Sequence, residues 1–234
     1  MDNTTHFSCS DALALWMLAV MLWLAAATPA VANPLATSAQ QALTSERYRF
    51  DVYYNNKRIG EHEFQVDRDN TEIRVRSSAK FLVKLLFVPV YKYQHLAEES
   101  WHSGCLQSLA ATTNDNGDYF EINMKPIGGS LLLSTVAPNP AATALRDPCP
   151  ASYAYWDLDL LRRGALINSQ TGDITDAQLL DRGVEEINGV SARRFTLIAG
   201  DTGNVELWYR ESDSQWIRLE TQRNGGTLAY RTGA

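Results

Sequence analysis

The chain of 234 residues is 45% hydrophobic and 21% charged, and its formal net charge is −6 at pH 7. This length and apolar content suffice to bury a substantial core within one β-rich domain. Acidic and basic residues are scattered along the chain without a basic run or an interleaved basic and aromatic stripe, so the composition argues against nucleic acid as a partner.

The first element is an uncharged apolar run, LALWMLAVMLWLAAA, which starts at position 13. Ala30 and Ala32 follow it and form a small-x-small cleavage site before Asn33. This order predicts a signal peptide over residues 1–32 and export to the periplasm.

An uncleaved N-terminal anchor is the alternative. The residues before the apolar run include Asp2 and Asp11 but no Lys or Arg, whereas signal peptides usually begin with a positive charge. The stretch from Ala12 to Ala32 would just span a bilayer core, which needs about 20 apolar residues. In that case the protein would be held at the inner membrane, and this segment would be its membrane contact.

Residues 33–45 are small and polar, and we expect them to form a flexible leader. A single β-rich domain is expected over residues 46–234, where apolar and polar residues alternate with period two. Phe50, Val52 and Tyr54 begin this pattern, which continues to the C-terminus. Such alternation is typical of strands with one buried face.

Turn residues separate the strand-like runs at short intervals. Asn188-Gly189 and Asn224-Gly225 are strong hairpin signals, because both residue types tolerate positive φ. We therefore predict a mainly β fold of about ten strands, in which a single antiparallel meander forms a curved half-barrel or open barrel.

Two segments interrupt the alternation. The first, FLVKLLFVPV at 81–90, fits either a buried strand or a short helix, and Pro89 favours a change of direction there. The second starts with a linker at 137–150, whose four prolines exclude regular structure, and continues into ASYAYWDLDLLRR. Near-helical spacing of Tyr155 and Leu158 in that stretch predicts one short helix packed across the sheet.

Two cysteines follow the predicted signal peptide, Cys105 and Cys149, 44 positions apart. The chain has no Cys-x-x-Cys spacing that would indicate redox chemistry. In an oxidising compartment the pair is expected to form a structural disulfide, which would stabilise the fold by about 4 kcal/mol on the chain-entropy model.

Several segments together resemble an exported bacterial family of unknown function, over nearly all of residues 46 to 232. These segments are RIGEHEF, GCLQSLAATTNDNG, YAYWDLDLL, LINSQTG, ELWYR and GGTLAYR. The hairpin with Gly60, followed by the apolar stretch and YKYQHLAEESW, is similar to a broader group of periplasmic domains. That resemblance implies a fold like the open β half-barrels of lipoprotein carriers and related lipid-binding proteins, and it implies no particular activity.

The sequence offers little for catalysis. His62, His95 and His102 lack the spacing of zinc ligands, so we predict no metal site and no cofactor. The chain also has no Gly-x-Ser-x-Gly motif, and no catalytic residue is assigned. An enzyme acting on an envelope lipid would need a polar cluster around His62 or His95.

An apolar and aromatic group is the strongest candidate for a binding site. Its members are Phe81, Leu82, Leu85, Leu86, Phe87, Tyr91, Tyr93, Tyr155 and Trp156. In an open curved sheet they would line a concave cavity for a lipid or acyl chain, since such pockets are mostly hydrophobic. The alternative is that they fill and seal the core.

These patterns favour an exported, non-enzymatic protein that binds a hydrophobic ligand. A scaffold factor of envelope assembly, which recruits a protein partner through its sheet edges, is the first alternative. A hydrolase of envelope lipids is the second.

Overall fold

The computed structural model describes residues 44–200 and 203–232, which form one fifteen-stranded sheet. The predicted signal peptide and its cleavage site at Ala30, Ala32 and Asn33 lie outside the described residues. Within the described ranges, no helix is long and apolar enough to cross a membrane.

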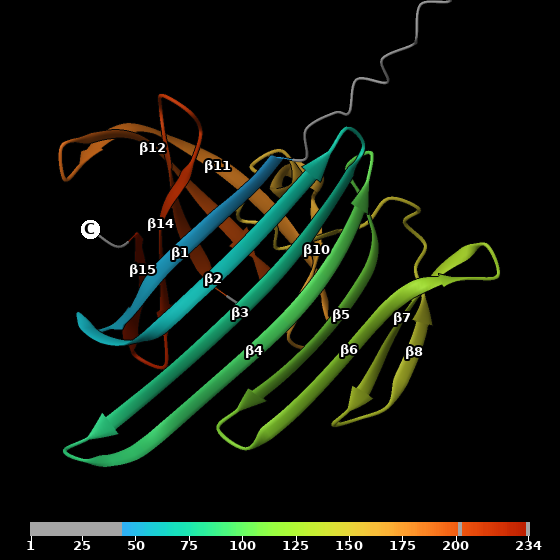
Figure 1. The fold of residues 1–234 in the computed structure, drawn as a ribbon, viewed down its shortest axis with the longest axis horizontal. Coiled ribbons are helices and arrows are strands. Elements are labelled where there is room, and N and C mark those ends of the chain that lie inside the picture. Colours follow the sequence, from blue (N-terminus) through green and yellow to red (C-terminus); the bar gives the residue numbers. More distant parts are fainter. Residues whose placement is uncertain (1–43, 201–202, 233–234) are drawn as a thin grey trace, which may run out of the picture. The chain divides into compact units, whose positions relative to one another are not determined.

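The sheet is a long meander in which the first and last strands of the described chain pair with each other at the centre of the strand order. The strands are β1 (Thr44–Tyr54), β2 (Lys57–Asp69), β3 (Glu72–Leu85), β4 (Val88–His102), β5 (Cys105–Asp115), β6 (Asp118–Ile127), β7 (Ser130–Ala137), β8 (Ala141–Ala144), β9 (Ala151–Ser152), β10 (Ala165–Ile167), β11 (Ile174–Ile187), β12 (Val190–Ala199), β13 (Asn204–Arg210), β14 (Trp216–Arg223) and β15 (Gly226–Thr232). Strands β1 to β8 follow one another outwards on one side, and β15 back to β9 on the other (Figure 1).

The first and last strands of the described chain hold the two halves together, because β1 pairs with both β2 and β15. All neighbouring strands are antiparallel except β9 and β10, which run parallel. The two outermost strands, β8 and β9, are not neighbours, so the sheet is open. This confirms the predicted mainly β fold with an open antiparallel meander, and its first strand begins two residues before the predicted domain start at 46.

Alternation along the strands builds the core on one face of the sheet. Trp216 is its centre, with its ring 4.3 Å from that of Phe50, 5.4 Å from Phe64 and 5.5 Å from Tyr155. Contacts between aromatic rings at such distances add to the free energy gained by removing their surface from water. Strands β1, β2 and β14 and the segment before β10 therefore meet at this tryptophan.

The predicted hairpin turns are confirmed. Asn188 and Gly189 have φ angles of 51° and 79°, and Asn224 and Gly225 have φ angles of 48° and 76°. Two successive residues with positive φ give the turn whose twist matches that of the flanking strands.

The predicted short helix is a turn-rich segment that ends in a single 3₁₀ turn, Leu160–Arg163. The Asp157 carboxylate accepts hydrogen bonds from the backbone N–H groups of Asp159 and Leu160 at 3.1 Å and 3.4 Å. Aspartate that bonds nearby backbone in this way competes with α-helix formation. Gly164 then ends the turn in the left-handed region, with φ of 86°.

The proline-rich linker also differs from its prediction, since Ala141–Ala144 within it forms β8 and pairs with β7. Short strands between prolines are compatible with a sheet edge, where one side of the strand needs no partner. Together with the short β9 and β10, this strand raises the number from about ten to fifteen.

The apolar segment 81–90 is neither a buried strand nor a helix. It forms the end of the β3–β4 hairpin, which turns at Leu86 and Phe87. The pairing shifts by one residue beside Pro89, between Val83 and Lys84. A proline lacks the N–H that a regular ladder requires, which explains the irregularity at this point.

Cys105 and Cys149 form the predicted disulfide, with a Cα–Cα distance of 4.6 Å. It joins the start of β5 to the segment before β9. Beside it, the N–H of Leu106 donates to the carbonyl of Pro150 at 2.9 Å, and the Arg163 guanidinium donates to the carbonyl of Gly104 at 2.7 Å. The disulfide thus fixes the segment between β8 and β10, residues 145–164, to the β4–β5 turn; we call this stretch the crossing segment.

Candidate functional site

Two histidines lie with tyrosines on the core face of β2, β4 and β15. The Nε2 atom of His62 is 2.7 Å from the hydroxyl of Ser77, and its Nδ1 atom is 3.2 Å from the hydroxyl of Tyr230. The Nδ1 atom of His95 is 2.8 Å from the hydroxyl of Thr113. His62 is therefore held between a hydroxyl group of the adjacent strand β3 and one of β15, which lies beyond β1, and His95 is held by a hydroxyl group of the adjacent strand β5.

Desolvation keeps both imidazoles neutral at pH 7. It lowers the pKa of His95 to about 4. The pKa of His62 is also well below its usual range, first because of desolvation and second because of the nearby His95. A neutral histidine beside Ser77 is the pairing that a serine nucleophile would need.

The group that would orient His62 in a catalytic triad is of the wrong type. A carboxylate normally orients the histidine and stabilises its protonated form. Here the neighbour of His62 is Tyr230, whose pKa desolvation raises well above the usual range, so the hydroxyl stays uncharged. We interpret Ser77, His62 and Tyr230 as a hydrogen-bonded polar network within the core face.

No group of three or more His, Cys, Asp or Glu residues that could hold a metal ion occurs in the described part of the chain.

The predicted ligand-binding residues fall into separate places. Phe81 is buried and stacks on Tyr93 at 5.0 Å, and the Tyr93 hydroxyl donates to Gln170 at 3.1 Å. Tyr155 packs on Trp216, as described above. Trp156 is buried in the core. The last two residues therefore help to fill the core.

The other members of the predicted group belong to the β3–β4 hairpin. Tyr91 is half-buried. Leu82 is 39% exposed, Leu86 is 86% exposed and Phe87 is 94% exposed. Leu85 pairs with Val88 in the hairpin ladder, and its side chain lies outside the described structure. Sequence patterning located this apolar cluster but did not predict its exposure.

A hollow of about 400 Å³ lies where the hairpin leaves the rest of the sheet. Most of its accessible surface is apolar, and it brings together three of the predicted residues, Phe81, Leu82 and Tyr93. Its other lining residues are Arg58, Ile59, Gly60, Glu61, Lys80, Lys92 and Gln94.

The cationic residues of this hollow and its glycine were not among the sequence predictions. Lys80 and Lys92 give it two positive charges without a close acidic partner, whereas Arg58 is paired with Asp51 at 2.7 Å. A Cβ atom at Gly60 would lie 2.0 Å from the carbonyl oxygen of Lys80, so glycine is required for the close approach of β2 to β3. The clustering of lysines in the sequence around the apolar run was the available signal for the charge.

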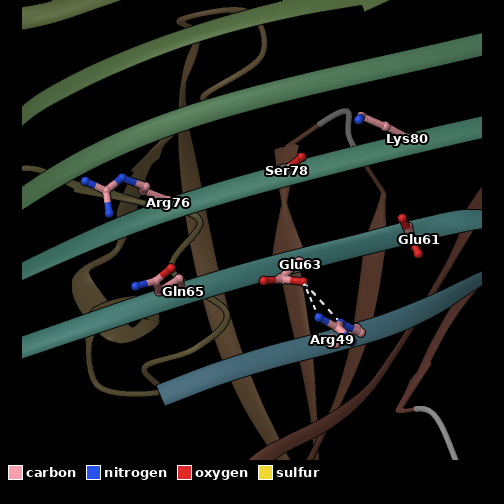
Figure 2. A pocket seen from close by; sticks show the side chains of 7 residues that line it. All are labelled: Arg49, Glu61, Glu63, Gln65, Arg76, Ser78 and Lys80. Carbon is pink, nitrogen blue, oxygen red and sulfur yellow. Dashed lines mark hydrogen bonds and ion pairs between the residues drawn. The ribbon is translucent and has the colours of Figure 1, made fainter. Parts of the chain in front are cut away.

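A second hollow, of about 280 Å³, is surrounded by charged and polar residues. It is lined by Arg49, Glu61, Glu63, Gln65, Arg76, Ser78 and Lys80. Figure 2 shows these side chains standing on β1, β2 and β3, with Arg49 donating to Glu63 at 2.9 Å. Arg76 lies 3.4 Å from Glu98. Exposed ion pairs of this kind contribute little and are typical of a solvated face, so this hollow is the weaker candidate.

Comparison with solved structures supports the fold. The crystal structure of a β-barrel-like protein of the domain of unknown function DUF1849 from Brucella abortus superposes with a TM-score of 0.60. The two are 8% identical, and the match covers 82% of this chain and 97% of the other. At this identity the likeness shows the fold alone.

No curated protein matches the sequence. A family model does match, over residues 50–233, which include every strand from β2 to β15. The chain therefore belongs to the family described as a domain of unknown function, DUF6134.

Proposed function

We propose that this protein is an exported, non-enzymatic lipid-binding protein that takes an acyl chain with an anionic head in the hollow at the base of the β3–β4 hairpin. The observation that carries the proposal is a hollow of about 400 Å³ that combines a mainly apolar lining with the ammonium groups of Lys80 and Lys92, neither of which has a close acidic partner. Ligand pockets typically combine an apolar wall with a few polar anchors.

The size and charge of the hollow indicate which part of an amphiphile it would hold. Small-molecule pockets typically measure about 300 to 1,000 Å³, so this hollow would take a portion of a chain and leave the remainder along the hairpin. Leu82 supplies an accessible apolar side chain, and Lys80 and Lys92 supply ammonium groups for a carboxylate or phosphate.

Export is proposed on two grounds. The apolar N-terminal run with its alanine site is typical of a signal peptide. The disulfide between Cys105 and Cys149 suits an oxidising compartment, because thiols in the cytosol are kept reduced.

Binding of a fluorescent fatty acid tests the proposal. Leu82→Asp is expected to weaken saturable binding by about tenfold or more, because burial of a leucine side chain against an acyl chain contributes about 1.5 to 3 kcal/mol. Leu82 is 39% exposed, so the substitution leaves the core intact.

Leu96→Asp is the matched control. Leu96 also lies in the hairpin, on β4, and is 56% exposed, but it does not line the hollow. Equal binding by the wild type, Leu82→Asp and Leu96→Asp would refute the hollow as the site. Absence of saturable binding by the wild type would refute the function itself.

A further inference from the structure

The β3–β4 hairpin extends beyond the strands on both sides of it. The pairing of β2 with β3 ends at Gly60 opposite Phe81, and the pairing of β4 with β5 ends at Tyr93 opposite Asp115. Lys92 still accepts a hydrogen bond from the backbone N–H of Asn116 at 2.7 Å. Residues 82–91 therefore continue as a two-stranded ribbon, and Figure 1 shows this ribbon reaching past the ends of β2 and β5. Two strands without neighbours are marginally stable in water.

The end of this ribbon is apolar and open to solvent. We define the hairpin tip as Leu86, Phe87, Val88 and Val90, whose exposed fractions are 86%, 94%, 64% and 49%. A single exposed apolar side chain is ordinary, whereas four within five positions of one protruding turn form a patch of the kind that marks an interaction site.

Lysines lie behind the hairpin tip, along the ribbon and at its base. The chain has five lysines, and four of them, Lys57, Lys80, Lys84 and Lys92, lie on the hairpin or next to it. The ammonium group of Lys57 reaches the ribbon and donates to the carbonyl of Lys84 at 3.2 Å. All four are exposed.

These lysines differ from the arginines of the same sheet. Among the described residues, no lysine lies within 4.0 Å of a carboxylate, whereas eleven arginines do, for example Arg58 at 2.7 Å from Asp51. The positive charge around the hairpin tip is therefore not neutralised by close acidic partners within the domain.

We propose that the hairpin tip inserts into the surface of a bilayer that contains anionic lipid. Phe87 and Leu86 would enter the boundary of the acyl chains, and the lysines behind them would contact headgroup phosphates. Tyr91, a few positions from the turn, would lie at headgroup level, where tyrosine is favoured. The unpaired lysines complement the negative charge of such a surface, and a narrow protruding ribbon with an apolar end is a shape that can insert into it.

The experiment uses a dye that reports the surroundings of the hairpin tip alone, so that the apolar N-terminal run does not affect the result. Phe87→Cys in a Cys9→Ser background leaves one free thiol, because Cys105 and Cys149 are joined. This thiol is labelled with an environment-sensitive fluorophore. Vesicles of phosphatidylcholine with about one third phosphatidylglycerol are compared with vesicles of pure phosphatidylcholine.

Ile127→Cys in the same background is the matched control. Ile127 is 48% exposed and ends β6, at the opposite end of the strands from the β3–β4 turn. We expect a blue-shifted, severalfold rise in fluorescence at position 87 with the anionic vesicles, a much smaller rise with the neutral ones, and no change at position 127. Added salt should reduce the response, because it screens the lysines.

The charges are tested with Lys57→Gln and Lys84→Gln, which lie outside the hollow of the proposed function. Each substitution should weaken the response to anionic vesicles about fivefold. An unchanged dye signal at position 87 would overturn the proposal. So would a concentration-dependent dimer that Phe87→Asp abolishes without any vesicle response, because a second copy would then cover the tip.

Failure of this proposal is distinguishable from failure of the proposed function. Fatty-acid binding depends on Leu82 in the hollow and is measured without vesicles, whereas membrane insertion depends on Phe87 and is measured by the dye. Either result can be negative while the other is positive.

Discussion

At the scale of single residues, the histidines show how strongly position in the sheet controls chemistry. His95 is 6% exposed, and burial lowers its pKa to about 4, whereas His102 at the end of the same strand is exposed. The unfolded chain takes up a proton on histidine near pH 6.5, so acid should favour unfolding through the buried residue.

The stability of the protein is predicted to fall as the pH drops from 6.5 towards 4. In this window the unfolded state binds a proton that folded His95 does not bind, which costs about 2 kcal/mol between pH 7 and pH 5. Urea unfolding at both pH values measures the effect, to which His62 adds in the same direction.

His95→Gln should reduce this dependence on pH, and His102→Gln should leave it unchanged. An identical loss of stability on acidification in both variants would show that His95 does not carry the effect.

Sequence alone predicted part of the histidine environment. Strand parity, which His62 shares with Phe64 and His95 shares with Tyr93, predicts that both point to the apolar face. The Tyr230 partner of His62 could not be predicted, because its hydroxyl group comes from a strand 168 positions away. Such a pairing depends on which strands become neighbours and not on local pattern.

At the scale of elements, the disulfide holds a segment that has little regular structure of its own. Between β8 and β10 the chain has a two-residue strand and one 3₁₀ turn. Few backbone hydrogen bonds order this segment, so the link from Cys149 to Cys105 has a large share in fixing it.

Replacing both cysteines, Cys105→Ser with Cys149→Ser, is predicted to lower the free energy of unfolding by up to about 4 kcal/mol. Urea unfolding without reductant measures the loss. Reductant should shift the wild type towards the stability of the double variant and should leave the variant where it is. A wild type that reductant does not destabilise would contradict the prediction.

The two interruptions show why element type was harder to predict than strand pattern. The apolar segment 81–90 carries no period that separates strand from helix. This segment is extended because its two parts, at the end of β3 and the start of β4, pair with each other. In the stretch around Tyr155, apolar spacing suggested a helix, but Asp157 bonds the local backbone and the aromatic rings pack into the sheet.

At the scale of the whole molecule, the antiparallel pairing of β1 with β15 joins the two halves of the meander into one cooperative unit. Trp216 strengthens this junction, since its side chain is 1% exposed and contacts the rings of Phe50 on β1, Phe64 on β2 and Tyr155 in the crossing segment. Loss of this side chain would leave a cavity between elements distant in sequence.

Trp216→Ala is therefore predicted to cost about 3 to 5 kcal/mol and to weaken both halves together. Amide exchange followed in β2 and in β14 should accelerate in parallel. Tyr119→Ala, at a 46% exposed position of β6, is the control and should change stability little. Faster exchange in β14 alone would show that the halves unfold independently.

The sequence by itself determined the class of fold, the faces of most strands, the hairpin turns and the disulfide. Period-two alternation, positive-φ residues and the count of cysteines are local or compositional signals, which require no knowledge of neighbours. Only the tertiary structure decided that Tyr155 and Trp156 belong to the core and that Phe87 is exposed. Whether an apolar side chain is buried depends on the strands beside it, and β2 and β5 end before the hairpin tip.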